Sequence, residues 1–166
     1  MGKIILAIAA VIILIGALLW QNKDFFKPIV DNLNGNISPS ADKKLDLSGK
    51  GLKNIPVHVF FQTGLEELDV SNNFLTGAIQ AEIRNLSNLR VLNASGNLIT
   101  DVPAEIGQLE KLEVLDLSNN EITDLPHELG NLKNLKVLNL SGNQYSRQDL
   151  GYIRDKLPRS IKIILD

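Results

Sequence analysis

The feature that most constrains this chain is a segment that recurs every 23 or 24 residues. Four copies read LEELDVSNNFL, LRVLNASGNLI, LEVLDLSNNEI and LKVLNLSGNQY, and they begin at residues 65, 89, 112 and 135. A less regular copy, DKKLDLSGKGL, begins at residue 42. A fixed period of this length is typical of a solenoid, in which each repeat is one structural unit that contacts only its neighbours. We therefore expect one repeat domain over residues 42–166.

Apolar and polar residues alternate within each repeat. Leu68 and Val70 flank Asp69, and the same alternation returns in the next three copies. A period of two predicts a short strand with one buried face. A single strand cannot bury that face alone, but stacked repeats can. The sequence thus predicts a stack of short strands that forms a parallel sheet on the concave side.

An asparagine stands at the same position of four repeats: Asn73, Asn97, Asn120 and Asn143. A buried amide both donates and accepts hydrogen bonds, so a column of amides can satisfy the backbone of successive tight turns. Leaving such a buried group unsatisfied costs about 1–3 kcal/mol. We interpret the column as a structural asparagine ladder rather than as a binding site.

The repeats match the pattern L-x-x-L-x-L-x-x-N-x-L, and the segments between them read LITDVPAEIGQLEKL and EITDLPHELGNLKNL. In both respects the chain resembles the leucine-rich-repeat family, and the resemblance covers residues 42–166. The longer repeat resembles a variant of the family pattern, with Gly77 as the extra residue and Gln80 where proline is usual. The resemblance implies an α/β solenoid with irregular or short helical segments on its convex side. It also implies that the solenoid binds proteins through its concave surface.

Both ends of the repeat array depart from the pattern. The first repeat carries Lys50 at the asparagine position, which is expected of an N-terminal cap that meets water. At the other end, Ser146 is a suitable helix N-cap and Pro158 is expected to end that helix. A final strand is predicted to cover the sheet edge through Ile161, Ile163 and Leu165.

The N-terminal segment is apolar. Residues 4–20 are seventeen residues without a charge, amide or hydroxyl. As a helix they would extend about 26 Å, against about 30 Å for a hydrocarbon core, and Lys3 and Lys23 can reach the interfaces. We predict a transmembrane signal anchor over residues 1–23 of a single-pass protein. Residues 24–41 gather proline, glycine and serine, which predicts a juxtamembrane linker.

Two other interpretations of the apolar segment stay open. A cleaved signal peptide would make the protein secreted, but it requires an A-x-A site just after the apolar run, and Ala7-Ile8-Ala9 lies too early. A buried core helix is the third interpretation. The short head before the run favours repeats outside the cytoplasm.

Composition argues against several classes of function. A net charge of −2 offers no broad attraction for nucleic acid, and the absence of cysteine excludes disulfides and thiolate metal sites. His58 and His127 lie three repeats apart, too far to share a metal or one catalytic triad. The Asp46, Asp69 and Asp116 column is interrupted by asparagine, which disfavours a calcium site. We expect no enzyme activity, no cofactor and no metal.

The outward positions of the predicted strands form the candidate binding surface. Charges in one column alternate in sign from strand to strand, so they can neutralise each other or present a pattern to a partner. The leading hypothesis is a monomeric, membrane-tethered recognition or scaffold module for a protein partner. The alternative is a structural or adhesive cell-envelope protein. The candidate partner-binding residues are Lys43, Asp46, Glu66, Asp69, Arg90, Asn93, Glu113, Asp116, Lys136 and Asn139.

Overall fold

The computed structural model describes residues 43–166, and the apolar segment predicted to cross a membrane lies outside them. Within the described part, no helix combines the length and the apolar character that a membrane crossing requires. Contacts divide the chain between residues 40 and 41, so the repeat unit is described by itself.

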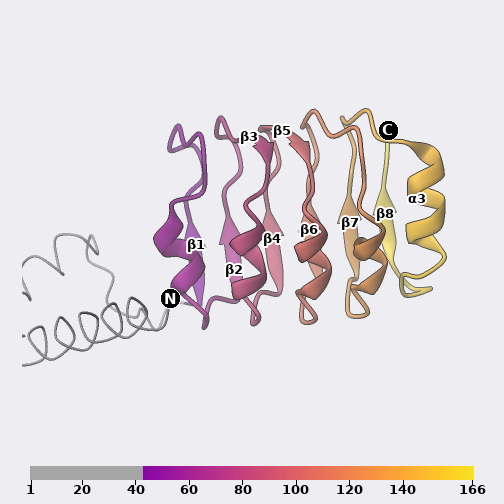
Figure 1. Ribbon diagram of the computed structural model, residues 1–166, viewed down its shortest axis with the longest axis horizontal. Coiled ribbons are helices and arrows are strands. Elements are labelled where there is room, and N and C mark those ends of the chain that lie inside the picture. The colour runs from indigo at the N-terminus through magenta and orange to yellow at the C-terminus, as the bar shows by residue number, and fades with distance from the viewer. Residues whose placement is uncertain (1–42) are drawn as a thin grey trace, which may run out of the picture. The chain divides into compact units, whose positions relative to one another are not determined.

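A six-stranded parallel sheet forms one side of the repeat unit (Figure 1). Its strands follow the order of the chain, and each contributes the same repeat positions as its neighbour. Leu68 lies opposite Leu92, for example, and Leu92 lies opposite Leu115. The strands are β1 (Lys44–Asp46), β2 (Glu67–Asp69), β4 (Val91–Asn93), β6 (Val114–Asp116), β7 (Val137–Asn139) and β8 (Lys162–Ile164).

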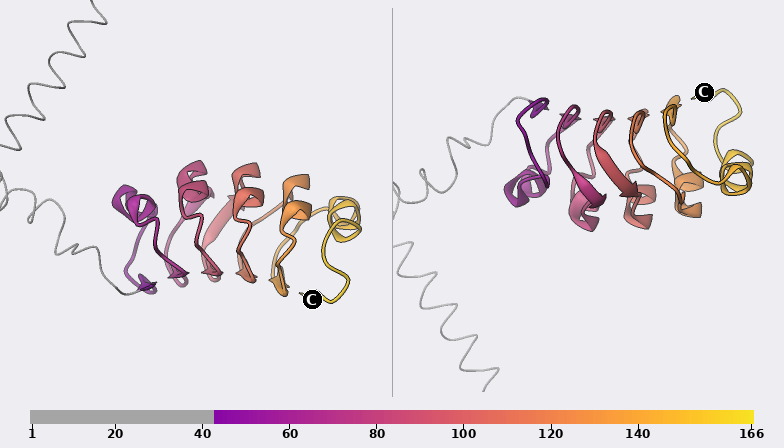
Figure 2. Two further views of the ribbon diagram at one scale, coloured as in Figure 1. Left: turned by 90° about the horizontal axis from the view of Figure 1, so that it is seen from below. Right: turned by 90° about the horizontal axis from the view of Figure 1, so that it is seen from above.

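Short 3-10 helices form the opposite layer, and Figure 2 shows the two layers as separate rows. Each helix follows an extended residue, which is proline in three of the four cases and Gln80 in the other. Side chains such as Leu92 and Ile106 fill the space between the layers and are fully buried. The predicted parallel sheet and short helical convex side are confirmed. The helices are η1 (Val57–Phe61), η2 (Ala81–Asn85), η3 (Ala104–Gln108) and η4 (His127–Asn131).

The 24-residue repeat adds a feature that the sequence did not predict. A second, two-stranded parallel sheet joins β3 (Thr76–Ala78) to β5 (Leu98–Asp101). The register shifts between Gly77 and Ala78, and Gly77 has a φ of +68°, which glycine adopts without strain. The extra residue is therefore absorbed as a bulge at the side of the solenoid, and the main sheet keeps its register.

Gln80 gains contacts that the usual proline would not make. Its side-chain amide donates to the Ile55 carbonyl at 2.7 Å, and its side-chain oxygen accepts from the Ile55 N–H at 3.4 Å. These two bonds join the convex segments of the first and second repeats. The departure from the family pattern thus connects neighbouring repeats.

A helix and the last strand close the C-terminal end. The helix α3 (Arg147–Arg154) begins at Ser146, whose hydroxyl accepts from the Asp149 N–H at 3.4 Å. Leu150 and Ile153 are buried, and α3 packs against η4. Beyond it, β8 pairs with β7, which confirms the predicted last strand at the sheet edge, and the pairing is parallel.

The helix ends before Pro158. Its last residue is Arg154, and the Lys156 N–H then donates to the Ile153 carbonyl at 3.0 Å in a tighter turn. A residue that precedes proline disfavours helical dihedrals, so the chain leaves the helix before it reaches Leu157. This turn directs the chain back towards the sheet.

Candidate functional site

The asparagine ladder lies in the turns that follow the strands. The Asn97 side-chain oxygen accepts from the Leu75 N–H at 3.1 Å, and its amide donates to the Val70 and Ala94 carbonyls, both at 3.1 Å. Each amide of the ladder therefore bonds its own turn and the preceding repeat. Equivalent bonds form at Asn73, Asn120 and Asn143. These hydrogen bonds give the ladder a structural role. They occupy the side-chain amides, which are therefore not available to bind a partner.

The alternating charged column of the concave face is paired along its length. Lys43 lies 2.7 Å from Glu66, Glu66 lies 3.8 Å from Arg90, and Arg90 lies 2.7 Å from Glu113. The column ends with Lys136, 2.5 Å from Glu113. Both carboxylates thus stand between two cations. Of the two uses that the sequence left open, mutual neutralisation is present in this structure.

The same pairing shifts the pKa of the charged groups. A hydrogen bond from Lys43 lowers the pKa of the Glu66 carboxyl, while burial opposes that effect. Hydrogen bonds from Lys136 and Arg90 lower the pKa of Glu113, and the bond to Glu113 raises the pKa of Arg90. The Glu66 and Glu113 carboxylates therefore keep their charge to a lower pH than an unpaired glutamate does.

The aspartate and asparagine column is also bonded internally. The Asn93 amide donates to the Asp69 carboxylate at 2.9 Å, and the Asn139 amide donates to Asp116 at 3.0 Å. The other oxygen of each aspartate, and the side-chain oxygen of each asparagine, accepts from the serine N–H two residues later. Asp46 makes the same bond to Ser48, and the hydrogen bonds from Ser48 lower its pKa. Asparagine between aspartates supplies the donor that a run of carboxylates would lack.

A stripe of three valines separates the two polar columns. Val91, Val114 and Val137 lie side by side in the register of β4, β6 and β7, and all three are only partly buried. Sequence reasoning did not include them among the binding residues, although valine at an outward strand position was a visible signal. We call these three residues the valine stripe. It is the apolar part of the concave face.

A shallow hollow of about 240 Å³ lies beside the charged column. Arg90, Glu113 and Lys136 line it together with Lys111 and Asn134. Lys111 donates to the Asn88 side-chain oxygen at 2.6 Å. The structure therefore brings the charged column and a hollow together at one margin of the sheet.

The histidines and acidic residues offer no site for a metal in residues 43–166. His58 is exposed on η1, and His127 lies on η4 with its ring centre 5.5 Å from that of Tyr152. Across that same range, no group of three histidines or acidic residues converges as metal ligands do.

Comparison with known proteins identifies the family. Residues 45–154 match a family model described as a leucine-rich repeat region. The chain belongs to the leucine-rich repeat family. The match spans every strand of the main sheet except the first residue of β1 and the last strand, β8.

Individual leucine-rich repeat proteins show how far the similarity extends. Receptor-like protein 34 of Arabidopsis thaliana is 39% identical over 73 residues, which cover 44% of this chain and 7% of that protein. A solved leucine-rich repeat protein of Leptospira interrogans is 41% identical with a TM-score of 0.62, over 67% of this chain and 28% of that one. The ectodomain of the Arabidopsis receptor kinase HAESA, solved with a peptide hormone ligand, is 28% identical with a TM-score of 0.58, over 68% and 20%.

This chain spans only a small part of each of these three proteins. Their leucine-rich repeat fold is shared, while the similarity extends over less than a third of each of these three proteins.

Proposed function

We propose that this leucine-rich repeat chain is a protein-recognition module that binds its partner through the concave sheet face. The observation that carries the proposal is the valine stripe between two polar columns on one continuous sheet. Interfaces combine an apolar centre with a polar rim, and the concave face has this arrangement. The proposed contact residues are the valine stripe and the ten candidates predicted from the sequence.

The charged column sets the kind of binding that we expect. Its charges already pair within the repeat unit, so a partner must replace existing contacts and gains little net affinity from them. Charge pattern then governs specificity and association rate, and the valine stripe supplies apolar contact area. We propose a binding strength that falls as salt concentration rises.

The HAESA ectodomain supports a role in recognition, because its solved structure holds a peptide hormone ligand. That ligand belongs to HAESA, and the partner of this chain is proposed only as a protein or peptide. We propose that the chain acts by binding and not as an enzyme.

We further propose that residues 4–20 tether the protein to a membrane. In this proposal residues 1–23 form the anchor, 24–41 the linker and 42–166 a monomeric repeat domain outside the cytoplasm. The apolar composition of residues 4–20 supports the anchor, and the resemblance to receptor ectodomains supports the location of the repeats.

An exchange of charges tests the concave face. Arg90→Glu combined with Glu113→Arg keeps a mutual ion pair but places like charges beside Glu66 and Lys136, and so changes the pattern that a partner meets. The control exchanges a convex pair, Arg84→Glu with Glu105→Arg, whose wild-type groups lie 3.5 Å apart. Each variant is used to capture partners from native membranes at several salt concentrations, and thermal melts check that both variants remain folded.

We expect the concave exchange to abolish capture of a partner that the convex exchange retains. If both variants capture the same partners with the same salt resistance, the concave face is not the binding surface. The self-neutralised charged column would then favour the second candidate, a structural or adhesive cell-envelope protein.

A further inference from the structure

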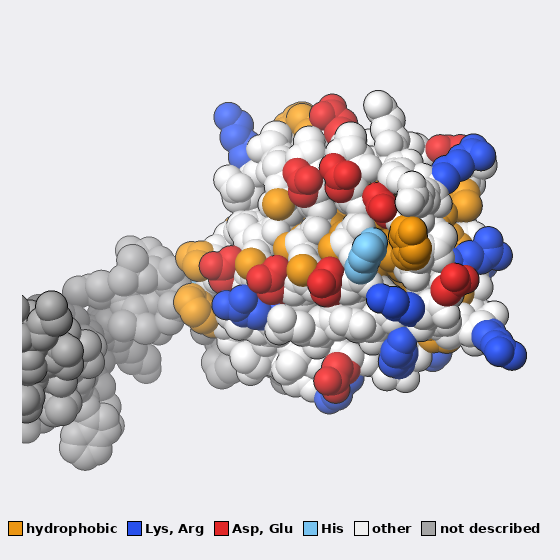
Figure 3. Space-filling view, turned by 45° about the vertical axis from the view of Figure 1, so that its right-hand side comes forward, with side chains coloured by type: hydrophobic (Ala, Val, Ile, Leu, Met, Phe, Trp, Pro, Cys, Tyr) orange, Lys and Arg blue, Asp and Glu red, His pale blue; other side chains and the backbone are white. Residues whose placement is uncertain are grey.

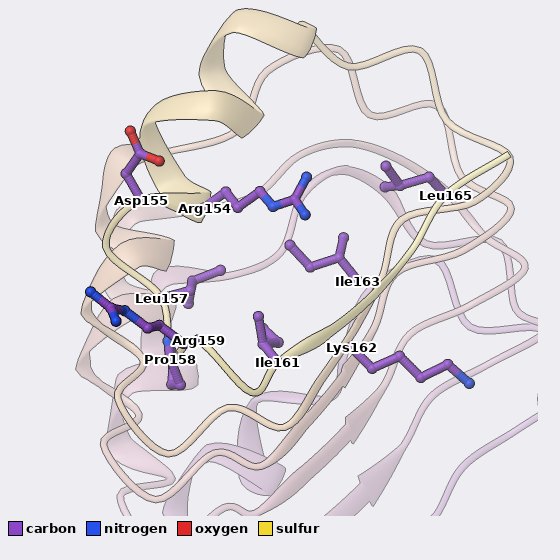
Figure 4. Close-up of a pocket in the computed structure, with 9 residues that line it drawn as sticks. All are labelled: Arg154, Asp155, Leu157, Pro158, Arg159, Ile161, Lys162, Ile163 and Leu165. Carbon is purple, nitrogen blue, oxygen red and sulfur yellow. The ribbon is translucent and has the colours of Figure 1, made fainter.

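A second hollow lies at the C-terminal end of the repeat unit. It has a volume of about 710 Å³ and lies between the loop after α3 and the strand β8 (Figure 4). Leu157, Ile161, Ile163 and Leu165 form its apolar part. Ile161 and Ile163 are only partly buried and Leu165 is 42% exposed, whereas Leu138 and Leu140 in the preceding strand segment are fully buried. We call this hollow the C-terminal groove.

The backbone of β8 adds hydrogen-bonding groups to the groove. The Lys162 N–H donates to the Lys136 carbonyl at 2.8 Å, and the Ile164 carbonyl accepts from the Leu140 N–H at 3.0 Å. Both bonds face β7. Because backbone groups of alternate residues point to opposite edges of a parallel strand, the N–H and carbonyl of Ile163 point to the outer edge. No other strand of residues 43–166 pairs with that edge.

The rim of the groove is positively charged. Arg154, Arg159 and Lys162 line it together with a single carboxylate, Asp155. None of the three cations forms an ion pair within the described range, whereas Lys43, Lys44, Arg90 and Lys136 on the concave face are all paired. Figure 3 shows lysine and arginine side chains gathered at this end, with acidic side chains in rows farther along the molecule.

We propose that the C-terminal groove binds an extended segment of a partner protein in which acidic and apolar residues alternate. The segment adds a strand to β8 and bonds the N–H and carbonyl of Ile163, as in other cases of strand addition. Its apolar side chains contact Ile161 and Ile163, which project to one side of the last strand segment, and Leu157 of the loop after α3 (Figure 4). Because side chains alternate along a strand, its carboxylates project to the other side, where they meet Lys162, while Arg154 adds positive charge at the rim.

Charge decides between this partner and a second copy of the chain. Two copies joined through their β8 edges would bring both sets of rim cations together, and like charges at close range oppose association. An acidic segment instead supplies the counter-charges that the rim lacks. Lys162 lies opposite Val137 of the valine stripe, so the site adjoins the concave face, whereas Ile161 and Ile163 lie on the other side of β8. The exchange of Arg90 and Glu113 therefore distinguishes this proposal from the function proposed for the concave face.

Peptide titration tests the proposal on the full-length chain in phosphatidylcholine nanodiscs. The probe is a short, end-blocked fluorescent peptide of alternating glutamate and valine, followed by fluorescence anisotropy. Arg154→Glu combined with Lys162→Glu should weaken binding at least about tenfold, because the cation that the carboxylates meet and a second cation of the rim both change sign. Arg147→Glu makes the same kind of change on α3 outside the groove and should leave binding unchanged. The concave exchange of Arg90 and Glu113 should also leave it unchanged.

Hydrogen exchange provides a second measurement that reports on strand addition itself. The Ile163 amide should exchange rapidly in the free protein and slowly when the peptide is bound. Equal peptide binding by the Arg154 and Lys162 variant, or no slowing at Ile163, would overturn the proposal. Slowing that appears only in nanodiscs containing phosphatidylserine, without peptide, would also overturn it and assign the groove to a lipid surface. Slowing that depends only on protein concentration would assign the groove to a second copy.

Discussion

Gly107 shows how a single residue sets the spacing between repeats. It is buried on η3, and a Cβ atom built there would lie 2.3 Å from the Glu128 carbonyl oxygen of the next repeat. No side chain fits at that distance without a shift of the backbone. Arg84 occupies the equivalent position on η2, where it is exposed and reaches Glu105 at 3.5 Å. Glycine is therefore required where two convex helices approach most closely.

We expect Gly107→Ala to lower the free energy of unfolding by at least about 1–3 kcal/mol, the usual cost of an overpacked core position. Gly151→Ala is the matched control, because Gly151 lies within α3 and a Cβ there meets nothing within 4 Å. In a helix that change should stabilise by about 0.5–1 kcal/mol. Urea melts of both variants give the two values. Equal changes in the free energy of unfolding for the two substitutions would contradict the close approach of Gly107 to Glu128.

Residue types that repeat along the chain were the most predictable part of the fold. The asparagine ladder follows from Asn73, Asn97 and their equivalents because one residue type at one repeat position has one physical role. Gln80 was visible only as a departure from the pattern, since its two bonds to Ile55 depend on the position of another repeat. The partial burial of the valine stripe also depends on how neighbouring strands pack, so the sequence of one strand could not predict it.

The sequence predicted those helices and strands whose positions depend on local signals. Alternation within each repeat predicted the main strands, and Ser146 predicted the start of α3. The small sheet of β3 and β5 was not predicted, because its register depends on how Gly77 bulges against the following repeat. The C-terminal groove was also missed, since it arises from the turn between α3 and β8 rather than from any motif.

The α3 element closes the core, and its buried face tests that role. Ile153 is fully buried against the last convex helix, whereas Arg147 on the same helix is exposed. Ile153→Ala should lower the free energy of unfolding by about 2–5 kcal/mol, while Arg147→Ala should change it by less than about 0.5 kcal/mol. Urea melts measure both. Removal of residues 146–166 should go further and cause aggregation, because it uncovers Leu138 and Leu140. A truncated chain that stays monomeric in light scattering would refute the closing role.

At the scale of the whole repeat unit, the charged column makes stability depend on pH. Glu66 and Glu113 have a pKa below their usual value of 4.5 in the folded protein, because lysine and arginine bond their charged forms. The unfolded chain then binds more protons than the folded one in acid, so these groups stabilise the fold above their ordinary pKa. That contribution is lost as the pH falls through the lower, folded values.

Urea melts should therefore give a nearly constant free energy of unfolding from about pH 7 to about pH 5, and a decline in more acidic solution. Replacing both groups, Glu66→Gln with Glu113→Gln, should make the decline shallower. The control, Glu82→Gln with Glu110→Gln, changes two exposed carboxylates outside the column and should leave the profile as it is. If the free energy of unfolding of the wild type does not decrease in acid, the lowered pKa of Glu66 and Glu113 is wrong.

The location of the whole molecule depends on the apolar segment at residues 4–20. We expect the full-length chain to fractionate with membranes at its full mass of 18.3 kDa, because the segment lacks an A-x-A site at its end. Ile12→Asp with Ile15→Asp should release it, since a central aspartate costs about 2.5–3.5 kcal/mol in a membrane helix. Ser38→Asp with Ser40→Asp adds the same charge to the linker and should leave the chain with the membranes. Fractionation and mass spectrometry of the wild type and the two variants show whether each chain stays with the membranes at its full mass. Recovery of a soluble wild-type form that begins shortly after Trp20 would instead establish a cleaved signal peptide and a secreted repeat protein.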